Sequence, residues 1–234
     1  MKLRLTSLTA VAVALTASPA HGAVLNANKQ CYREGARLDP TKTDVVAFGG
    51  GPFTPGGSVR VTRDGLPLAG LLPVNAAGFV SGLTTPPIID PALQRTFTLV
   101  ATDVANPALT GSVTRLVTQL AVNVRPSGGP PSTRRRISAR GFTGASTLYA
   151  HIRRGRRTRT VRIARISGPC GTARARKRVF GRGAANGVYR VQFDSSRRYS
   201  AATFPAVNFR VRIRTIFRRR SASASASERW VRTD

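Results

Sequence analysis

Arginine is the residue whose abundance and spacing point most directly to a chemistry in this 234-residue chain. The sequence contains 34 arginines and 4 lysines against 9 acidic residues, which gives a formal charge of +29. A guanidinium binds a phosphate or carboxylate through two parallel hydrogen bonds, so these residues offer polyanion binding. A GC-rich genome also enriches arginine over lysine, and the ratio of the two therefore carries little weight by itself.

The position of the charge is more informative than its amount. Residues 21–126 contain 9 basic and 6 acidic side chains, whereas residues 127–234 contain 27 basic and 3 acidic ones. Codon composition acts on both halves alike and does not account for this asymmetry. A positive field confined to one region favours a partner of opposite charge, and the alternative is a solvated basic surface without a dedicated ligand.

Two groups of arginines are spaced for contact with an extended polyanion. The first group is Arg210, Arg212 and Arg214, which as alternate residues of a strand would project from one face at steps of about 6.6 Å. The second group surrounds Gly155 at an expected hairpin tip. The candidate polyanion-binding residues are Arg153, Arg154, Arg156, Arg157, Arg159, Arg210, Arg212 and Arg214. Candidate partners are an anionic cell-envelope polymer, an acidic polysaccharide, an anionic membrane surface, or nucleic acid bound without sequence specificity. A polyanion ligand predicts binding that weakens steeply with salt.

Residues suited to catalysis or metal binding are scarce. His151 could join Asp194 and either Ser195 or Ser196 in a Ser-His-Asp arrangement, but no nucleophile-elbow motif accompanies them. We therefore assign no catalytic residue, no metal ligand and no cofactor, and we expect a protein that is not an enzyme. The alternative is a secreted enzyme on a β-sandwich scaffold, which would need a concave pocket that joins His151 to a carboxylate and a nucleophile.

The N-terminal residues have the pattern of a secretory signal peptide. Lys2 and Arg4 precede an apolar stretch over residues 5–17, and small residues follow with the spacing of a cleavage site. This stretch is shorter than the roughly 20 apolar residues that cross a membrane. We predict a mature chain that begins between His21 and Val24 and that is secreted or associated with the cell envelope.

Cys31 and Cys170 are the two cysteines of the chain. In an exported protein an isolated pair forms a disulfide more often than two free thiols. We predict a bridge between them, which would link the start of the first half of the chain to the middle of the second. The alternatives are a buried free thiol at each position, or pairing with another chain.

The segments that must position these residues alternate between apolar and polar with a period of two, which predicts strands. Residues 207–217 alternate most regularly, and Asp64-Gly65 is a hairpin-type turn. The even-numbered residues of 116–124 form one face of a further segment, which we predict to be a single strand. Residues 126–134 are rich in proline and glycine, which is typical of a linker. Residues 221–227 alternate serine and alanine, so we predict a flexible tail that includes Trp230.

An internal similarity indicates two copies of one unit. Residues 51–59 and 140–148 both place Phe-Thr and a small-residue turn before an alternating segment. The predicted fold is therefore all-β, with two tandem β-sandwich modules, a cleaved signal peptide and a flexible C-terminal tail. The predicted boundaries are a signal peptide at 1–23, a first module at 24–125, a linker at 126–134, an arginine-rich second module at 135–217 and a disordered tail at 218–234.

The motifs resemble the immunoglobulin-like repeats of secreted bacterial proteins. The segments that carry this resemblance are Phe-Thr-Pro-Gly-Gly-Ser-Val at 53–59, Ala-Ala-Gly-Phe at 76–79, Gly-Val-Tyr-Arg-Val at 187–191 and Tyr-Ser-Ala-Ala-Thr at 199–203. The chain is also similar to exported proteins of high-GC actinobacteria, which have a segment like Ser-Gly-Pro-Cys-Gly at 167–171. It implies an immunoglobulin-like sandwich outside the cell that serves adhesion, spacing or binding, and it brings no catalytic residue. This chain departs from such repeats in its arginine content and in lacking the acidic clusters with which some of them bind calcium.

Overall fold

The computed structural model describes residues 22–34, 43–181, 183–217 and 224–233. These residues form strands joined by turns and no α-helix, which confirms the all-β prediction. The described part of the chain accordingly has no helix long and apolar enough to cross a membrane. The predicted signal peptide lies outside the described residues up to residue 21, and Ala23 already packs in the core of the first module.

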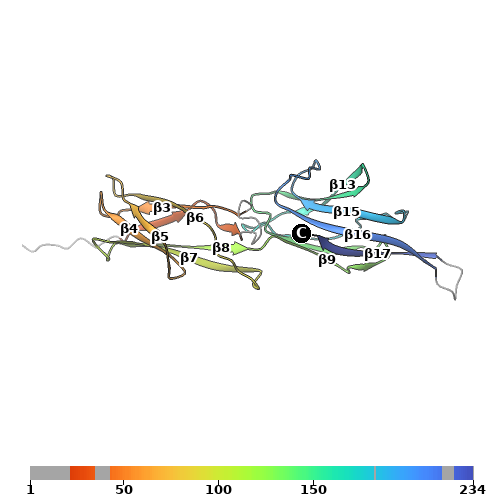
Figure 1. The fold of residues 1–234 in the computed structure, drawn as a ribbon, viewed down its shortest axis with the longest axis horizontal. Helices are drawn as coiled ribbons and strands as arrows, with labels where there is room; N and C mark the ends of the chain where they lie inside the picture. The colour runs from red at the N-terminus through yellow and green to blue at the C-terminus, as the bar shows by residue number, and fades with distance from the viewer. Residues whose placement is uncertain (1–21, 35–42, 182, 218–223, 234) are drawn as a thin grey trace, which may run out of the picture.

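Two sheets packed face to face form the first module, drawn in orange to green in Figure 1. Alternate apolar residues of both sheets meet in one core, where the rings of Tyr32 and Phe97 make an edge-to-face contact at 5.9 Å. One sheet has the order β1-β3-β6 and the other β2-β8-β7-β4-β5. The strands are β1 (Val24–Ala27), β2 (Cys31–Arg33), β3 (Val46–Gly51), β4 (Ser58–Arg63), β5 (Leu66–Pro73), β6 (Val80–Thr84), β7 (Gln94–Asp103) and β8 (Thr110–Thr118).

The second module repeats this layout. A sheet of order β14-β11-β9 packs on a six-stranded sheet of order β10-β17-β16-β15-β12-β13, around a second apolar core. The strands are β9 (Ala121–Arg125), β10 (Gly128–Gly129), β11 (Arg135–Arg140), β12 (Thr147–Arg154), β13 (Arg157–Arg165), β14 (Ala173–Lys177), β15 (Gly187–Asp194), β16 (Ala206–Phe217) and β17 (Ala224–Thr233). The predicted pair of sandwich modules agrees with this arrangement.

The internal similarity of the sequence corresponds to an equivalence of position. Phe53 and Phe142 are both buried, and their backbone N–H groups donate to the carbonyl oxygens of Gly78 and Gly171, respectively. Gly171 has a φ of +59°, and a Cβ atom there would lie 2.2 Å from the carbonyl oxygen of Phe142. Glycine is therefore required where this turn closes on the strand.

The boundary between the modules lies earlier than predicted. Strand β8 ends at Thr118 in the first sandwich and β9 begins at Ala121 in the second, so Gln119 and Leu120 alone connect them. The predicted first module at 24–125 therefore ends too late. The predicted linker at 126–134 is wrong as well, because these residues lie inside the second module and include β10, which pairs with β17.

A change of phase marks this boundary in the sequence. Val113 and Val117 are buried in β8, whereas Val122 and Val124 are buried in β9. A regular strand keeps one parity on its buried face, and here the switch from odd to even positions falls where the chain leaves one sheet and enters another. The prediction treated residues 116–124 as one strand and overlooked this switch.

The C-terminal segment is a strand, so the predicted disordered tail at 218–234 is wrong for residues 224–233. Strand β17 pairs antiparallel with β16 along its whole length. Trp230 is 6% exposed and packs against the rings of Phe180, Phe193 and Phe209. The alternation of serine and alanine was interpreted as low complexity, but backbone pairing requires no particular side chains. Residues 218–223 and 234 lie outside the described residues.

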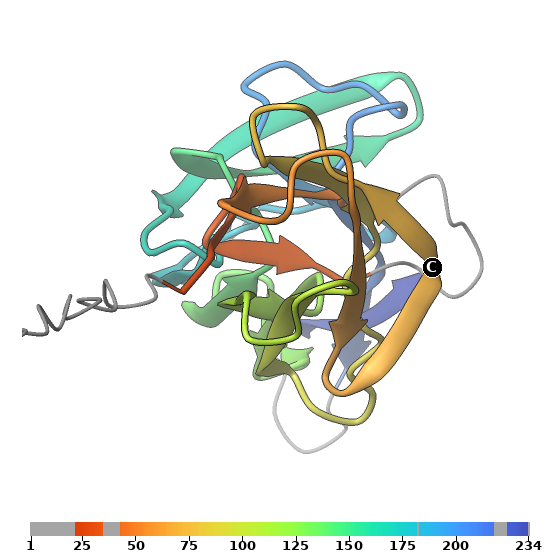
Figure 2. The ribbon, with the colours of Figure 1, turned by 90° about the vertical axis from the view of Figure 1, so that its left-hand side faces the viewer.

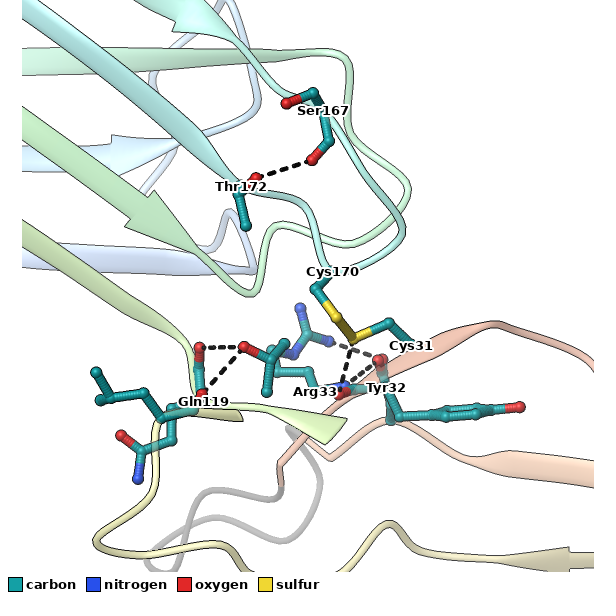
Figure 3. The surroundings of a disulfide bond; sticks show 10 residues. Cys31, Tyr32, Arg33, Gln119, Ser167, Cys170 and Thr172 are labelled. Atoms are coloured by element: carbon teal, nitrogen blue, oxygen red, sulfur yellow. Dashed lines mark hydrogen bonds and ion pairs between the residues drawn. A yellow bond between two sulfur atoms is a disulfide. The ribbon is translucent and has the colours of Figure 1, made fainter. Parts of the chain in front are cut away.

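The disulfide between Cys31 and Cys170 joins the two modules, as predicted (Figure 3). Its Cα atoms are 5.1 Å apart, and the two cysteines are separated by 139 residues in the sequence. Cys31 begins β2 of the first module, and Cys170 lies in the turn between β13 and β14 of the second. The modules follow one another along the long axis in Figure 1, and Figure 2 looks along that axis with the first module in front.

An ion pair and a cation–π contact add to the junction beside the disulfide. A terminal nitrogen of Arg33 lies 3.0 Å from a carboxylate oxygen of Asp44, and both side chains are buried. The same guanidinium lies 4.3 Å from the ring centroid of Phe204, which belongs to the second module. Burial lowers the pKa of Arg33, and the Asp44 carboxylate opposes this shift. Arg33 therefore links a buried pair of one module to an aromatic ring of the other.

A buried carboxylate at the end of β7 gives the first module a pH dependence. Asp103 accepts hydrogen bonds from the backbone N–H groups of Thr54, Ala105 and Asn106, and the bond from Thr54 is the chief reason that the pKa of Asp103 is lowered. An acid whose pKa is lower in the folded state stabilises the fold above its ordinary pKa of about 3.9. This stabilisation is lost as the pH falls through the lower, folded-state value.

We expect Asp103→Asn to lower the free energy of unfolding at pH 7 and to flatten its fall below pH ~4. Both carboxylate oxygens of Asp103 accept from backbone N–H groups, whereas an asparagine side chain has a single acceptor oxygen. Its NH₂ group would point at backbone donors on one side and leave them without an acceptor. Urea unfolding of wild type and variant between neutral pH and pH ~3 measures both effects. Equal loss of stability on acidification in the two proteins would contradict the assignment.

Candidate functional site

The outer face of the six-stranded sheet gathers arginines from four strands. Residues paired directly across an antiparallel sheet project from the same face. Arg153 of β12 pairs with Arg190 of β15, and Arg190 pairs with Arg210 of β16, so these three form a row across the sheet. We define the arginine face by this row and its neighbours on β16 and β17: Arg153, Arg190, Arg210, Arg212, Arg214 and Arg229.

Alternation along each strand explains why these side chains point outward. On β16 the residues on either side of Arg210 and Arg212 are buried, for example Phe209 and Val211, and on β15 Tyr189 and Val191 flank Arg190. With the apolar positions committed to the core, the arginines must occupy the other face. All members of the arginine face are exposed except Arg153, which is half-buried.

The arginine face carries closely spaced positive charges, and no acidic side chain that the structure describes is exposed among them. Adjacent strands are about 4.8 Å apart, so successive arginines of the row are near one another. Asp194 is the only carboxylate of the second module whose side chain the structure describes, and it is buried beside His151. Among the described side chains, no ion pair involves Arg190, Arg210 or Arg212. Their charge is available to a ligand.

A hollow of about 480 Å³ lies on this face. Its lining includes the three arginines of the row together with polar side chains, namely Arg153, Arg190, Arg210, Gln192, Asn208 and Thr233. Both hydrogen bonds of the Gln192 amide nitrogen are used within the protein, by Asp194 and by the carbonyl of Ser200. The volume lies in the range of small-ligand sites.

The loop between β15 and β16 closes one side of the hollow. The guanidinium of Arg153 lies 4.5 Å from the centroid of the Tyr199 ring, and one of its terminal nitrogens donates to the Tyr199 hydroxyl at 2.5 Å. Stacking on an aromatic ring leaves the charge of an arginine intact while restricting its rotamers. Arg153 is therefore held in place by the loop, whereas Arg190 and Arg210 carry no such contact.

His151 and Asp194 form a buried polar network beside the hollow. Both side chains are fully buried, and Nε2 of His151 lies 3.1 Å from a carboxylate oxygen of Asp194 and 3.0 Å from the carbonyl oxygen of Ser196. Since Nε2 faces two acceptors, this nitrogen is the donor in both contacts. Nδ1 forms a hydrogen bond with the hydroxyl of Thr160, at 2.8 Å. The network fastens the turn after β15 to β12 and β13.

The Ser-His-Asp arrangement considered from the sequence is only partly assembled. The structure brings His151 and Asp194 together, but the Ser196 hydroxyl donates to the carbonyl of Arg198 instead of to His151. The hollow includes His151 in its lining but neither Asp194 nor Ser195 or Ser196. The pocket that the enzyme alternative required, with a carboxylate and a serine nucleophile beside His151, is therefore not formed by these residues.

The candidate arginines of the sequence analysis divide between two sides of the sheet. Arg153, Arg210, Arg212 and Arg214 share the arginine face. The other, inner side of the sheet carries Arg154, Arg157 and Arg159. In the pairing of β12 with β13, Arg159 is the partner of the buried Ile152, and Arg157 is the partner of Arg154, which lies on the same side of β12 as Ile152. Arg156 lies at the exposed tip of the β12–β13 hairpin.

The arginines on the opposite side make contacts within the protein. Arg154 donates to the carbonyl of Asn186 and lies over the Tyr189 ring, and Arg159 donates to the carbonyl of Val179. The eight candidates therefore do not form one continuous surface. The reason is that two successive residues of a strand always point to opposite faces.

Two members of the arginine face were missed. Arg190 could have been found, because it alternates with the inward residues Tyr189 and Val191. Arg229 could not, because the low-complexity residues before it hid the strand β17. Within the described residues, no three histidine, cysteine or acidic side chains gather so as to hold a metal ion.

Fold and site together define an all-β protein of two sandwich modules, of which the second carries a strongly basic sheet face. No family model matches the chain, and no curated protein matches it. Among solved structures, it is similar to a tetra-tandem repeat in the extending region of a large adhesion protein, with 14% sequence identity and a TM-score of 0.25. That match covers 91% of this chain, which spans half the length of the matched one.

Proposed function

We propose that this protein is an exported, non-catalytic binding protein whose second module holds a linear anionic polymer on the arginine face. The observation that carries the proposal is the row Arg153–Arg190–Arg210, in which like charges face each other across three adjacent strands. Like charges directly opposite one another destabilise a sheet. A bound chain of carboxylates or phosphates would remove this repulsion and form paired hydrogen bonds with each guanidinium.

The chemistry of the hollow favours a repeat unit that carries hydroxyl groups as well as an acid group. Arg190 and Arg210 would bind the carboxylate or phosphate, and the side chains of Asn208 and Thr233 would bind hydroxyls of the same unit. An acidic polysaccharide or a phosphate-bearing envelope polymer fits this description. A flat membrane surface would reach Arg212 and Arg214 but leave the hollow empty. Nucleic acid is disfavoured because the aromatic residues of the hollow are engaged within the protein: Tyr199 is stacked on Arg153, and Phe209 packs against Phe193 and Trp230.

The extracellular location is part of the same proposal. It rests on the disulfide between Cys31 and Cys170, since such bridges persist in oxidising compartments, and on the signal-peptide pattern of the first residues. The envelope of a cell is also where anionic polymers are abundant. The secreted-enzyme alternative would require a nucleophile other than Ser195 and Ser196 beside the pair His151 and Asp194.

The salt dependence of binding tests the proposal. We expect the mature protein to bind polygalacturonate, a carboxylate-bearing sugar polymer, at about 50 mM salt and to bind it much more weakly at about 200 mM. Neutral dextran should not bind. Replacing Arg190, Arg210 and Arg212 by threonine, which suits strands, should lower the slope of log K against log salt by about 2, at roughly 0.7 per contact. Fluorescence anisotropy of the labelled polymer measures both quantities.

A charge-matched variant is the control. Arg165, Arg197 and Arg198 are exposed and lie outside the hollow, so their replacement by threonine removes the same net charge from the module. This variant should keep nearly the wild-type slope. Equal losses in the two variants would show attraction by net charge alone and overturn the site, and salt-insensitive binding or no binding at low salt would overturn the function.

A further inference from the structure

The second module carries another row of arginines, on the outer face of its three-stranded sheet. Arg136 of β11 pairs with Arg125 of β9 on one side and with Arg176 of β14 on the other. All three side chains are exposed, and the inward neighbours Val124, Ile137 and Ala175 belong to the core or pack against it. We call Arg125, Arg136 and Arg176 the second arginine row.

The second arginine row repeats the arrangement of the row Arg153–Arg190–Arg210. In both, three arginines are register partners on three adjacent antiparallel strands, about 4.8 Å apart. Arg174, also exposed, lies two residues before Arg176 on the same face of β14. No ion pair of the described side chains involves any of these residues.

The two rows lie on opposite sides of one sandwich. The three-stranded and six-stranded sheets share a single core, in which Val122 and Ile137 of one sheet join Val191 and Val211 of the other. The outer faces of the two sheets therefore point away from each other. Packed sheets are about 10 Å apart, and the arginine side chains extend beyond them on each side. This separation exceeds the Debye length of about 8 Å at physiological salt, so anions bound on the two faces would hardly repel each other.

We propose that the second module is bivalent and holds one anionic chain on each face, so that a single protein molecule crosslinks two polymers. This inference rests on the proposed function for its first face and adds a second site of the same chemistry. The two sheets that carry the rows are packed on a single apolar core, which makes the module a rigid spacer between the two sites. Crosslinking of envelope polymers by a monomer would follow from this geometry.

A capture experiment with the mature protein tests bivalency. Beads coated with polygalacturonate are loaded with the protein at about 50 mM salt, washed, and exposed to fluorescent polygalacturonate in solution. Wild type should retain the labelled chain on the beads. The variant Arg125→Thr, Arg136→Thr, Arg176→Thr should bind the beads as wild type does but retain about tenfold less labelled chain, because one face remains. The charge-matched variant of Arg165, Arg197 and Arg198 should retain wild-type amounts.

The complementary variant, Arg190→Thr, Arg210→Thr, Arg212→Thr, removes the other binding face, so that each face is tested by its own triple substitution. It should also lose the labelled chain while binding beads through the second arginine row. Retention of the labelled chain by either triple variant overturns bivalency, since the second polymer would then be held elsewhere or by a second copy of the protein. Bead binding by wild type without retention of labelled chain overturns bivalency but leaves the proposed function standing. No bead binding at all overturns the proposed function itself.

Discussion

Replacement of both Cys31 and Cys170 by serine is expected to lower the free energy of unfolding by about 4 to 5 kcal/mol. The disulfide closes a loop of 139 residues, and the entropy that a crosslink removes from the unfolded chain grows with the logarithm of loop length. Because the bridge joins the two modules, the chain of either module stays crosslinked to the other module when it unfolds alone, and its conformational entropy is reduced in that state as well. The loss should therefore appear in the transitions of both modules.

Denaturant unfolding with and without a reducing agent measures this effect. Wild type treated with a thiol reductant should unfold at the same denaturant concentration as the double serine variant, and the variant should not respond to the reductant. A single replacement, Cys170→Ser, should match the double variant, because either change opens the loop. A loss below about 1 kcal/mol would mean that the long loop contributes little to the unfolded-state entropy, contrary to expectation.

Replacement of Trp230 by alanine is expected to cost about 3 to 5 kcal/mol of unfolding free energy. The indole packs on three phenylalanine rings, and its removal leaves a cavity in the core of the second module. A disordered tail, as the residues before Trp230 indicate, would instead make this substitution neutral. The prediction therefore tests whether β17 is an integral strand of the sheet.

Val231 offers the matched control, because it lies on the same strand with 54% of its surface exposed. Val231→Ala should change the free energy of unfolding by no more than about 0.5 kcal/mol. The intrinsic fluorescence of Trp230, the only tryptophan, should also be blue-shifted in the folded protein and move to the red on unfolding. Equal and small effects of the two alanine substitutions would show that the indole is not buried.

The strands and their faces were predictable because they depend on local patterns. Alternation at residues 207–217 placed Arg210, Arg212 and Arg214 on one face of a strand, and the Asp64-Gly65 turn joins β4 to β5 with both residues at positive φ. The serine–alanine stretch at the start of β17 alternates as well, but its side chains are small and carry no strong apolar signal, so its pattern resembles low complexity instead of a strand. Prediction failed for β17 because this segment becomes a strand through backbone hydrogen bonds to β16, which its own side chains do not indicate.

The module boundary and the two sides of the hairpin show a second limit. Residues 116–124 were one strand in prediction, and a single change of buried parity, between Val117 and Val122, separates two domains. Arg153 and Arg154 were grouped by proximity in sequence, yet adjacent residues of a strand point to opposite sides. In both cases the signal is the parity of the buried residues, which changes between Val117 and Val122 and which places Arg153 and Arg154 on opposite sides of β12.

The sequence by itself determined that this chain is all-β, that it contains a repeated unit, that its charge lies in the second half, and that Cys31 and Cys170 are available to pair. Only the tertiary structure decided which arginines face one another. Arg153, Arg190 and Arg210 come from three strands separated by long stretches of chain, and their row depends on the register of two strand pairs. A one-residue slip would turn a strand's arginines into the core, so burial of the apolar residues on β15 and β16 sets the register and thereby forms the row.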